Sequence, residues 1–286
     1  MEEITRQMVR GLLPPRDPEG HKGTFGKVLC LCGAVGYTGA PVLAAEAAVR
    51  SGSGLVYLGV PEAIWQVTAV KCVSAMPFPL PSREGGLALA AEPAVRQRMA
   101  SCDAVLIGCG LGRGAETDAL TRRMLDVEKP LVLDADGINA AAAHMDELER
   151  RRGLVTVLTP HEGEFLRVGG DLTAGRETAA LRFAAAYGVY LILKGHRTVV
   201  AAPDGRLAVN TTGNSGMAKG GSGDILSGVV LSLLGQGIAP FDACCAAVYC
   251  HGLAGDLAAA EKGERGMTPG DLLAALPAAF RETERG

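Results

Sequence analysis

A single aspartate at the end of a glycine-rich loop is the strongest candidate for a catalytic group in this sequence. Six glycines fall within residues 213–228, and Asp224 directly follows the densest group of them, at 220–223. The apolar run behind it predicts a helix that is buried on most sides. Loop amides at a helix N-terminus favour an anion such as phosphate. An acid beside a phosphate is costly unless it takes a proton from an attacking hydroxyl, and the alternative role for Asp224 is a plain helix N-cap.

Four further chemically useful residues each follow the end of a predicted strand. They are Gly110, Asp134, His161 and Lys194. In open α/β sheets, ligands bind beyond the carboxyl ends of the strands. We therefore expect these four residues to lie at one edge of a sheet, close to the glycine loop.

The first two strand-end segments allow two readings each. Gly110 and Gly112 belong to a turn with three glycines in five residues, which lets a ligand approach the backbone or simply forms a tight strand-to-helix turn. Asp134 and Asp136 could hold a metal through water, or serve as a helix cap and a turn former. Capping is favoured for Asp136.

The next segment reads Thr-Pro-His-Glu-Gly-Glu and contains a His and a Glu three residues apart. This spacing places His161 and Glu164 on one face of the following helix. At a helix N-terminus His161 is expected to be a neutral hydrogen-bonding group. Glu164 could orient His161 or bind a magnesium-bound water, and an ordinary helix start is the remaining alternative.

The last segment joins a strand to a β-hairpin and carries cationic and hydroxyl groups. Lys194, Arg197 and Thr198 suit nucleotide phosphates, although Lys194 could merely cap a sheet edge. His196 is expected on the surface, and His251 is expected in the core of a helix.

The elements that position these residues alternate between strand and helix. Strands are predicted at residues 27–32, 55–60, 104–107, 130–133, 155–158 and 189–193, with a hairpin at 198–209 around an Asp-Gly turn. Helices are predicted at residues 1–13, 41–51, 62–70, 92–100, 117–127, 223–234, 242–261 and 268–280, and residues 77–86 are expected to form a loop. The pattern predicts an α/β protein with a parallel sheet and one domain over residues 1–286.

Composition excludes several classes of protein. The net charge is −3, aromatic residues make up 4%, and no long Lys/Arg block is present, so no nucleic-acid partner is expected. No uninterrupted apolar run of 18 residues and no signal peptide are found, so we expect a cytoplasmic protein without a membrane span. None of the eight cysteines forms a CxxC pair, which favours buried free thiols.

Taken together, these motifs resemble the ribokinase-like superfamily, and within it the ADP-dependent NAD(P)H-hydrate dehydratase family. The segments that carry the resemblance are HKGTFGKVLCLCG, GYTGAPVLAAEAAVRSGSGLV, IGCGLGR, LVLDADGIN, TPHEGEF, LKGHRT and NTTGNSGMAKGGSGDILSG. They extend from about His21 to Phe280. The resemblance implies a three-layer α/β/α sandwich with a mostly parallel central sheet.

The resemblance also implies a function in nicotinamide nucleotide repair. Such a lyase dehydrates the S-epimer of NAD(P)H hydrate to NAD(P)H, consuming ADP (or ATP) with Mg²⁺ and releasing AMP and phosphate. Family members commonly form tetramers. Because only about 20 residues precede His21, the epimerase module of many members is expected to be a separate protein. The alternatives are a vitamin-precursor kinase of the same fold and a nucleotide-binding regulator without catalysis.

The resemblance assigns roles to individual residues. The residues implied to contact the hydrate are Ala40, Gly110 or Gly112, His161 and Asp224, with Asp224 as the base. Those implied to bind the nucleotide are Lys194, Gly195, His196, Arg197, Thr198, Gly221, Ser222 and Gly223. Apart from the resemblance, Glu164 is the candidate metal ligand, through water. The sequence departs from the family pattern at Ser215, Lys219 and Ser222, where members often have Pro, Thr and Thr. Lys219 could add charge near the phosphate.

Overall fold

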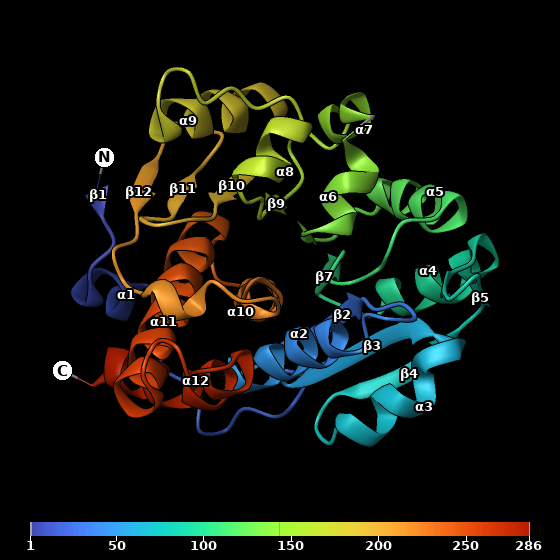
Figure 1. Cartoon of the computed structure of the whole chain (residues 1–286), viewed down its shortest axis with the longest axis horizontal. Helices are drawn as coiled ribbons and strands as arrows, with labels where there is room; N and C mark the ends of the chain where they lie inside the picture. The colour runs from blue at the N-terminus through green and yellow to red at the C-terminus, as the bar shows by residue number, and fades with distance from the viewer. Residues whose placement is uncertain (1, 143, 286) are drawn as a thin grey trace.

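The computed structural model describes residues 2–142 and 144–285, and its central feature is a ten-stranded sheet (Figure 1). In spatial order the strands are β1 (Glu2–Glu3), β12 (Leu207–Val209), β11 (Val199–Ala201), β10 (Tyr190–Leu193), β9 (Thr156–Leu158), β8 (Leu131–Leu133), β7 (Ala104–Ile107), β2 (Lys27–Leu31), β3 (Leu55–Pro61) and β4 (Met76–Leu80). All neighbours pair in parallel except β10 with β11 and β11 with β12, which form the expected hairpin. A separate small hairpin contains β5 (Ser82–Arg83) and β6 (Gly86–Leu87).

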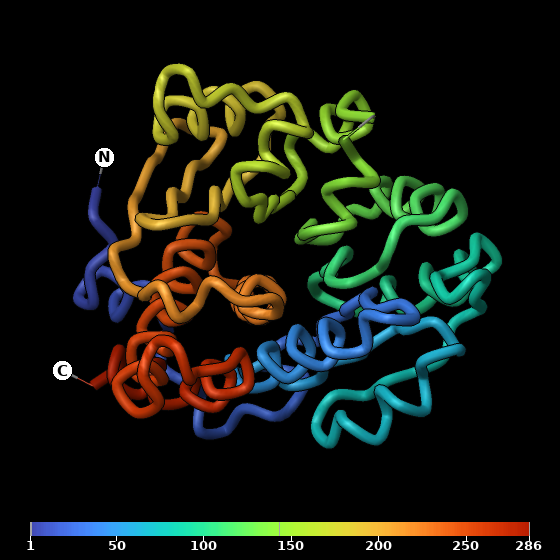
Figure 2. The backbone as a smooth tube through the Cα atoms, in the orientation of Figure 1, coloured from blue at the N-terminus to red at the C-terminus, as the bar shows by residue number. Residues whose placement is uncertain are grey.

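Helices cover both faces of the sheet and complete the three-layer α/β/α sandwich expected from the sequence (Figures 1 and 2). One face carries α1 (Arg6–Leu12), α2 (Gly39–Arg50), α3 (Glu62–Lys71), α10 (Ser222–Gly235), α11 (Pro240–Lys262) and α12 (Pro269–Glu284). The other carries α4 (Glu92–Ala100), α5 (Ala115–Arg123), α6 (Asp136–Ala141), α7 (Met145–Glu149), α8 (Glu162–Arg167) and α9 (Arg176–Tyr187). Short 3₁₀ turns occupy Leu89–Ala91, Met124–Asp126 and Ser215–Met217.

Successive side chains of a strand point to opposite faces of the sheet, and this alternation builds one hydrophobic core on each face. In β2, Val28 and Cys30 pack into the core shared with α2, α10 and α11, whereas Leu29 and Leu31 pack into the opposite core. All four side chains are buried. Because both faces of a parallel sheet are covered, its strands are apolar throughout rather than alternating with polar residues.

The chain reverses its direction of travel across the sheet between β2 and β7. From β2 it proceeds outward through β3 to β4, then returns to place β7 on the other side of β2 and continues through β8, β9 and β10. Loops that leave β2 and β7 therefore diverge at the carboxyl edge. This is the place where open α/β sheets bind ligands.

Helix α10 lies unusually close to α2. A Cβ on Gly228 would lie 2.1 Å from the Ala44 carbonyl oxygen and 2.9 Å from the Cβ of Ala47. Only glycine permits this close approach of the two helices.

Helix α9 forms where no element was predicted, and two further segments differ from the sequence-based predictions. The stretch expected to be a loop from Pro77 contains β4, which pairs in parallel with β3. Pro77 and Pro79 are tolerated there because β4 is an edge strand in the described sheet, with no second neighbour that needs their missing N–H groups. The expected first helix is also shorter, since Glu2–Glu3 pairs with β12.

Burial within the molecule describes the surroundings of the longest apolar helix and of the cysteines. Helix α11 is long and apolar enough to cross a membrane by length and composition, but 72% of its apolar window is buried inside the molecule, as expected for a core helix. All eight cysteines are free and buried, as predicted.

Candidate active site

The glycine loop leads directly into α10, and its last residues are held from two sides. Gly221 has φ of +106°, and a Cβ there would lie 2.6 Å from the side chain of Leu43 in α2. His251 in α11 donates its Nε2–H to the Ser222 carbonyl at 2.8 Å. Burial lowers the pKa of His251 to about 4, so the ring is neutral and acts as a fixed donor. The core position predicted for His251 is confirmed.

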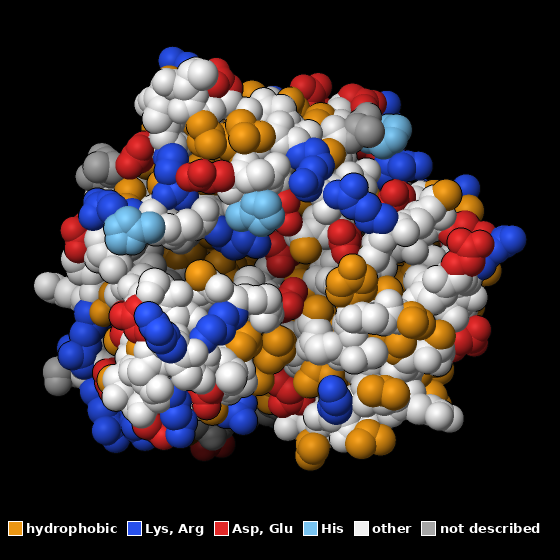
Figure 3. Space-filling view, viewed as in Figure 1, with side chains coloured by type: hydrophobic (Ala, Val, Ile, Leu, Met, Phe, Trp, Pro, Cys, Tyr) orange, Lys and Arg blue, Asp and Glu red, His pale blue; other side chains and the backbone are white. Residues whose placement is uncertain are grey.

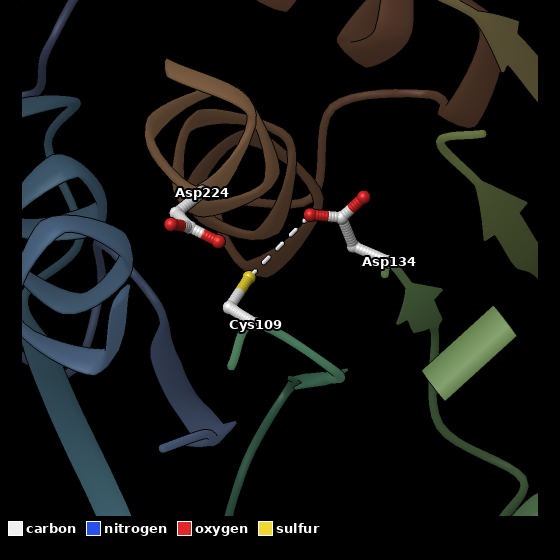
Figure 4. Close-up of side chains that lie close together, drawn as sticks. All are labelled: Cys109, Asp134 and Asp224. Atoms are coloured by element: carbon white, nitrogen blue, oxygen red, sulfur yellow. Dashed lines mark hydrogen bonds between the residues drawn. The ribbon is translucent and has the colours of Figure 1, made fainter. Parts of the chain in front are cut away.

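Asp224 projects from the first turn of α10 toward the ends of β7 and β8 (Figure 4). Its carboxylate, the Cys109 thiol and the Asp134 carboxylate each have a ligating atom within 4.8 Å of the others. Burial, and after it the negative charge of Asp134, raise the pKa of Asp224 to about 6. A carboxyl group with a pKa near neutrality is suited to act as a general base.

Asp134 is a buried carboxylate with a full set of partners. Its Oδ1 accepts from Lys194 Nζ and from Thr159 Oγ1, both at 2.8 Å, and its Oδ2 accepts from the Cys109 thiol at 3.6 Å. Burial alone would raise the pKa of Asp134, but the Lys194 ammonium holds it below its ordinary value. The side chain is therefore an ionised anchor, and the capping role considered for it does not apply.

Lys194 occupies the space between Asp134 and the glycine loop. A Cβ on Gly223 would lie 3.3 Å from the Lys194 ammonium nitrogen. Glu164 Oε2 is 3.9 Å from the same nitrogen. Burial lowers the pKa of Lys194, but the two carboxylates outweigh this effect and raise it, so the ammonium stays charged. The alternative role as a cap for the sheet edge is thus unnecessary.

His161 is the N-cap of α8, and Glu164 closes a capping box with it. His161 Nδ1 accepts from the backbone N–H of Gly163 at 3.0 Å, and Glu164 Oε2 accepts from the backbone N–H of His161 at 2.9 Å. Glu164 Oε1 lies 3.6 Å from His161 Nε2. This geometry favours the orienting role for Glu164 over the metal role. His161 pairs with Lys194 in an isolated parallel bridge, so the two segments are adjacent.

Ala40 and the glycine turn after β7 also meet. A Cβ on Gly110 would lie 2.8 Å from the Cβ of Ala40, which stands in the first turn of α2. The Gly112 N–H donates to Asp136 Oδ2 at 2.9 Å. Asp136 is thus the first residue of α6 and also fixes the glycine turn, which is a more specific role than capping.

The segment after β10 is supported by an arginine that the sequence did not single out. Arg176 donates to the carbonyls of Leu193 and Lys194, both at 3.0 Å, and to that of His196 at 2.6 Å. The Thr198 hydroxyl donates to the Gly195 carbonyl at 3.0 Å. The side chains of His196 and Arg197 are exposed, as predicted for His196.

Lys219 does not add charge to the glycine loop, contrary to expectation. Its ammonium donates to the carbonyls of Glu264 and Arg265 in the α11–α12 connection, at 3.2 and 3.1 Å. A cavity of about 690 Å³ lies on this outer side of the loop, lined by Ser215, Gly216, Lys219, Lys262, Gly263, Glu264, Arg265 and Gly266. Ahead of the loop, Asp256 accepts from the Gly213 N–H at 2.9 Å and fastens it to α11.

Sequence reasoning missed several residues that build this site. Cys109 was grouped with the inert thiols although it stands directly before Gly110, and Thr159 precedes the His-Glu motif. Their adjacency to the motifs was the available signal. No sequence signal pointed to Arg176, because it is remote in sequence from the turn that it supports.

In the space-filling view, charged and histidine side chains gather around a hollow near the centre of the face over the N-terminus of α10 (Figure 3).

Comparisons with known proteins place this arrangement in one family. The family model described as NAD(P)H-hydrate dehydratase matches residues 28–278. The chain is 34% identical to the ADP-dependent (S)-NAD(P)H-hydrate dehydratase of Bacillus subtilis over 98% of both proteins. It is 35% identical to the enzyme of the same name from Neisseria meningitidis, covering 89% of this chain and 86% of that one.

Longer relatives carry an additional part. The chain is 42% identical to a bifunctional NAD(P)H-hydrate repair enzyme from Moorella thermoacetica over 98% of its own length, but spans only 54% of that protein. It therefore spans about half the length of the bifunctional relatives that it matches.

Solved structures agree with these relatives. The ADP/ATP-dependent NAD(P)H-hydrate dehydratase from Bacillus subtilis, co-crystallised with ATP and Mg²⁺, superposes with a TM-score of 0.82 at 31% identity over 99% of both chains. A ribokinase-like superfamily protein from Enterococcus faecalis gives 0.85 at 25% identity, covering 100% of this chain and 97% of the other. The sandwich is thus ribokinase-like, and the chain belongs to the NAD(P)H-hydrate dehydratase family.

Proposed function

We propose that this protein is an ADP-dependent lyase that converts the S-epimer of NAD(P)H hydrate to NAD(P)H, with release of AMP and phosphate. The observation that carries the proposal is the position of Asp224. It has a pKa raised to about 6 by burial, and it stands at a helix N-terminus with the Lys194 ammonium beside the preceding residue. An acid, a cation and backbone amides thus converge where a phosphoryl group would be transferred.

The reaction proceeds in two stages. Asp224 takes the proton of the C6 hydroxyl of the hydrate, and that oxygen attacks the terminal phosphorus of ADP. The bond to the bridging oxygen breaks, and AMP leaves. The ring nitrogen then supplies its electron pair to expel phosphate from C6, and loss of the proton at C5 restores the ring. The sum is hydrate plus ADP giving NAD(P)H, AMP and phosphate.

The two ligands approach from different elements in this proposal. The hydrate contacts Ala40 and the glycine turn at Gly110 and Gly112, together with His161 and Asp224. The nucleotide contacts the segment from Lys194 to Thr198 and the loop residues Gly221, Ser222 and Gly223. Contact between Ala40 and Gly110, and proximity of Lys194 to Gly223, support this division.

Mg²⁺ is expected to enter with the nucleotide. Among the described residues, Asp134 is engaged by Lys194, and Glu164 is engaged by the His161 N–H and stands 3.9 Å from the same ammonium. Neither forms a dedicated cage of oxygen ligands, and Mg²⁺ commonly relies on phosphates and water. Bound in that way, the ion would neutralise phosphate charge, while the positioning of the reacting groups falls to the protein.

One assay tests the proposal. Hydrated NADH is incubated with the protein, ADP and Mg²⁺, and absorbance at the reduced nicotinamide band is followed. We expect the absorbance to recover. Absence of recovery with both ADP and ATP would reject the dehydratase and leave a kinase or a regulator of the same fold.

We further propose that the protein works as one folded unit over residues 1–286, as a homotetramer in the cytoplasm, alongside a separate epimerase. Exposed apolar side chains at α3 and β4 support self-association, and they include Val67, Val70, Val73 and Met76. Light scattering of the purified protein tests it, since a monomeric mass would contradict self-association.

A further inference from the structure

One buried carboxylate, that of Asp134, links the cationic and the acidic parts of the site. Oδ1 of Asp134 holds the Lys194 ammonium at 2.8 Å. Oδ2 accepts from the Cys109 thiol, whose sulfur also lies near Asp224 (Figure 4). Asp134 therefore contacts the Lys194 ammonium on one side and the Cys109 thiol, which lies beside Asp224, on the other.

The backbone around Asp134 is fixed as firmly as its side chain. Ala135 adopts φ 47° and ψ −114°, a conformation that residues with a Cβ rarely adopt, and the Gly137 N–H donates to the Asp134 carbonyl at 2.8 Å. A Cβ on Gly108 would lie 1.7 Å from the same carbonyl oxygen. The close approach of Gly108 and the hydrogen bond from Gly137 hold this strained turn in one place.

Burying an ionised carboxylate is costly unless its partners compensate. Asp134 is 1% exposed, and its partners are the Lys194 ammonium, the Thr159 hydroxyl and the Cys109 thiol. Thr159 is itself buried, and its hydroxyl lies 3.4 Å from Ser227 in α10. These partners fix the negative charge of Asp134 next to the first two turns of α10.

Asp134 fixes the position of the Lys194 ammonium. A lysine side chain has four rotatable bonds, and this one also has Glu164 within 3.9 Å as a competing partner. The shorter contact to Asp134 directs the ammonium to within 3.3 Å of the Cβ position of Gly223. Without Asp134, the ammonium would be free to move toward Glu164 and away from the loop.

The effect on Asp224 is electrostatic. The charged groups that face Asp224 are Asp134, Lys194 and Asp136, and the Cys109 thiol lies beside it. After burial, the charge of Asp134 is the largest cause of the raised pKa of Asp224. Asp134 therefore makes Asp224 a stronger base than an isolated carboxylate at the same place would be.

We infer that Asp134 is a positioning residue for phosphoryl transfer, which places the Lys194 ammonium at the glycine loop and strengthens Asp224 as the base. The inference rests on the proposed function. It assigns Asp134 no contact with either substrate, and its consequences differ from those of a residue that only stabilises the fold.

The variant Asp134→Asn separates the two possibilities. We expect kcat to fall about 10²-fold, the scale of an ångström-sized misplacement of reacting groups. The acid limb of the kcat–pH profile should move to lower pH, because one negative charge beside Asp224 is gone. ADP affinity, measured by calorimetry, should fall, because the Lys194 ammonium is no longer held at the glycine loop that binds the nucleotide. A fall in kcat with an unmoved acid limb and unchanged ADP affinity would overturn the inference.

A second variant serves if Asp134→Asn does not fold. Thr159→Val removes one hydrogen bond to Asp134 and keeps the side-chain shape, so we expect a smaller fall in kcat and a smaller loss of ADP affinity. Thr156→Val is the matched control three residues earlier, in β9, because the buried Thr156 hydroxyl accepts a hydrogen bond from Arg151 and none to Asp134 is found among the described residues. Equal kcat for Thr159→Val and Thr156→Val would overturn the inference. If the wild type itself produces no NADH, the proposed function fails, whereas ADP binding by Thr159→Val as tight as by Thr156→Val would count against the positioning role.

Discussion

Lys194 and Gly223 meet at the first turn of α10, where a Cβ on Gly223 would lie 3.3 Å from the Lys194 ammonium nitrogen. The two residues come from the end of β10 and from the glycine loop. Their contact adds a fixed positive charge to the helix N-terminus, whose amides already favour an anion. Asp224 follows Gly223 directly, so the acid stands beside the place where phosphate charge is stabilised.

Asp224→Asn should abolish most of the activity without preventing nucleotide binding. An asparagine keeps the shape of the side chain but cannot take a proton from the C6 hydroxyl. We expect the rate of NADH formation to fall at least about 10²-fold, the lower end of the contribution of a positioned general base. Calorimetry with ADP should give an affinity close to that of the wild type, and normal turnover would contradict the role of Asp224.

The pH dependence of kcat should reveal the raised pKa of Asp224. The base acts in its ionised form, so the rate should be full above pH 6 and fall as the pH drops through about 6. An exposed aspartate would instead lose activity only near pH 4. Initial rates between pH 4.5 and 8 at saturating ADP measure this profile, and a rate that stays flat down to about pH 4.5 would be inconsistent with a buried base.

Ionised Asp224 should lower the free energy of unfolding of the protein. Because the folded-state pKa of Asp224 is raised, the folded protein holds the proton more tightly than the unfolded chain, and stability falls as the pH rises from about 4 to 6. Well above pH 6 the full cost of this pKa shift, roughly 3 kcal/mol, applies. Asp224→Asn should therefore unfold at higher urea than the wild type at pH 8, with the difference shrinking below pH 4. A less stable variant at pH 8 would refute this assignment.

Gly228 should be essential for the packing of α10 on α2. In Gly228→Ala the new Cβ would lie 2.1 Å from the Ala44 carbonyl oxygen, so the helices must separate. Overpacking of this kind costs about 1–3 kcal/mol, occasionally more. Gly220→Ala is the matched control in the same stretch, because a Cβ at Gly220 meets no atom within 4 Å. Thermal unfolding should show a lower Tm only for Gly228→Ala.

The sequence predicted the parallel sheet well because its strands are short apolar runs between glycine-rich turns. β4 escaped detection because Pro77 and Pro79 normally exclude a strand, and only its place at the edge of the described sheet makes them acceptable. Edge position depends on strand order, which no local pattern records.

The candidate site was only partly predictable for a related reason. Gly110, His161, Lys194 and Asp224 each carry a local motif, and the structure brings their segments together. The roles of Asp134 and Arg176 depend on partners 60 and 18 residues away, Lys194 in each case, so they emerged only from the fold. The predicted position of the Lys219 charge was wrong, because proximity to a loop in sequence does not determine where a long side chain points.

The most direct test of the central claim is the stoichiometry of products from hydrated NADH, ADP and Mg²⁺. NADH, AMP and free phosphate are quantified in one reaction by absorbance, chromatography and ³¹P NMR. The account predicts equal amounts of all three with the wild type and none above background with Asp224→Asn. A stable phosphorylated nicotinamide product, or NADH formed without consumption of ADP, would contradict it.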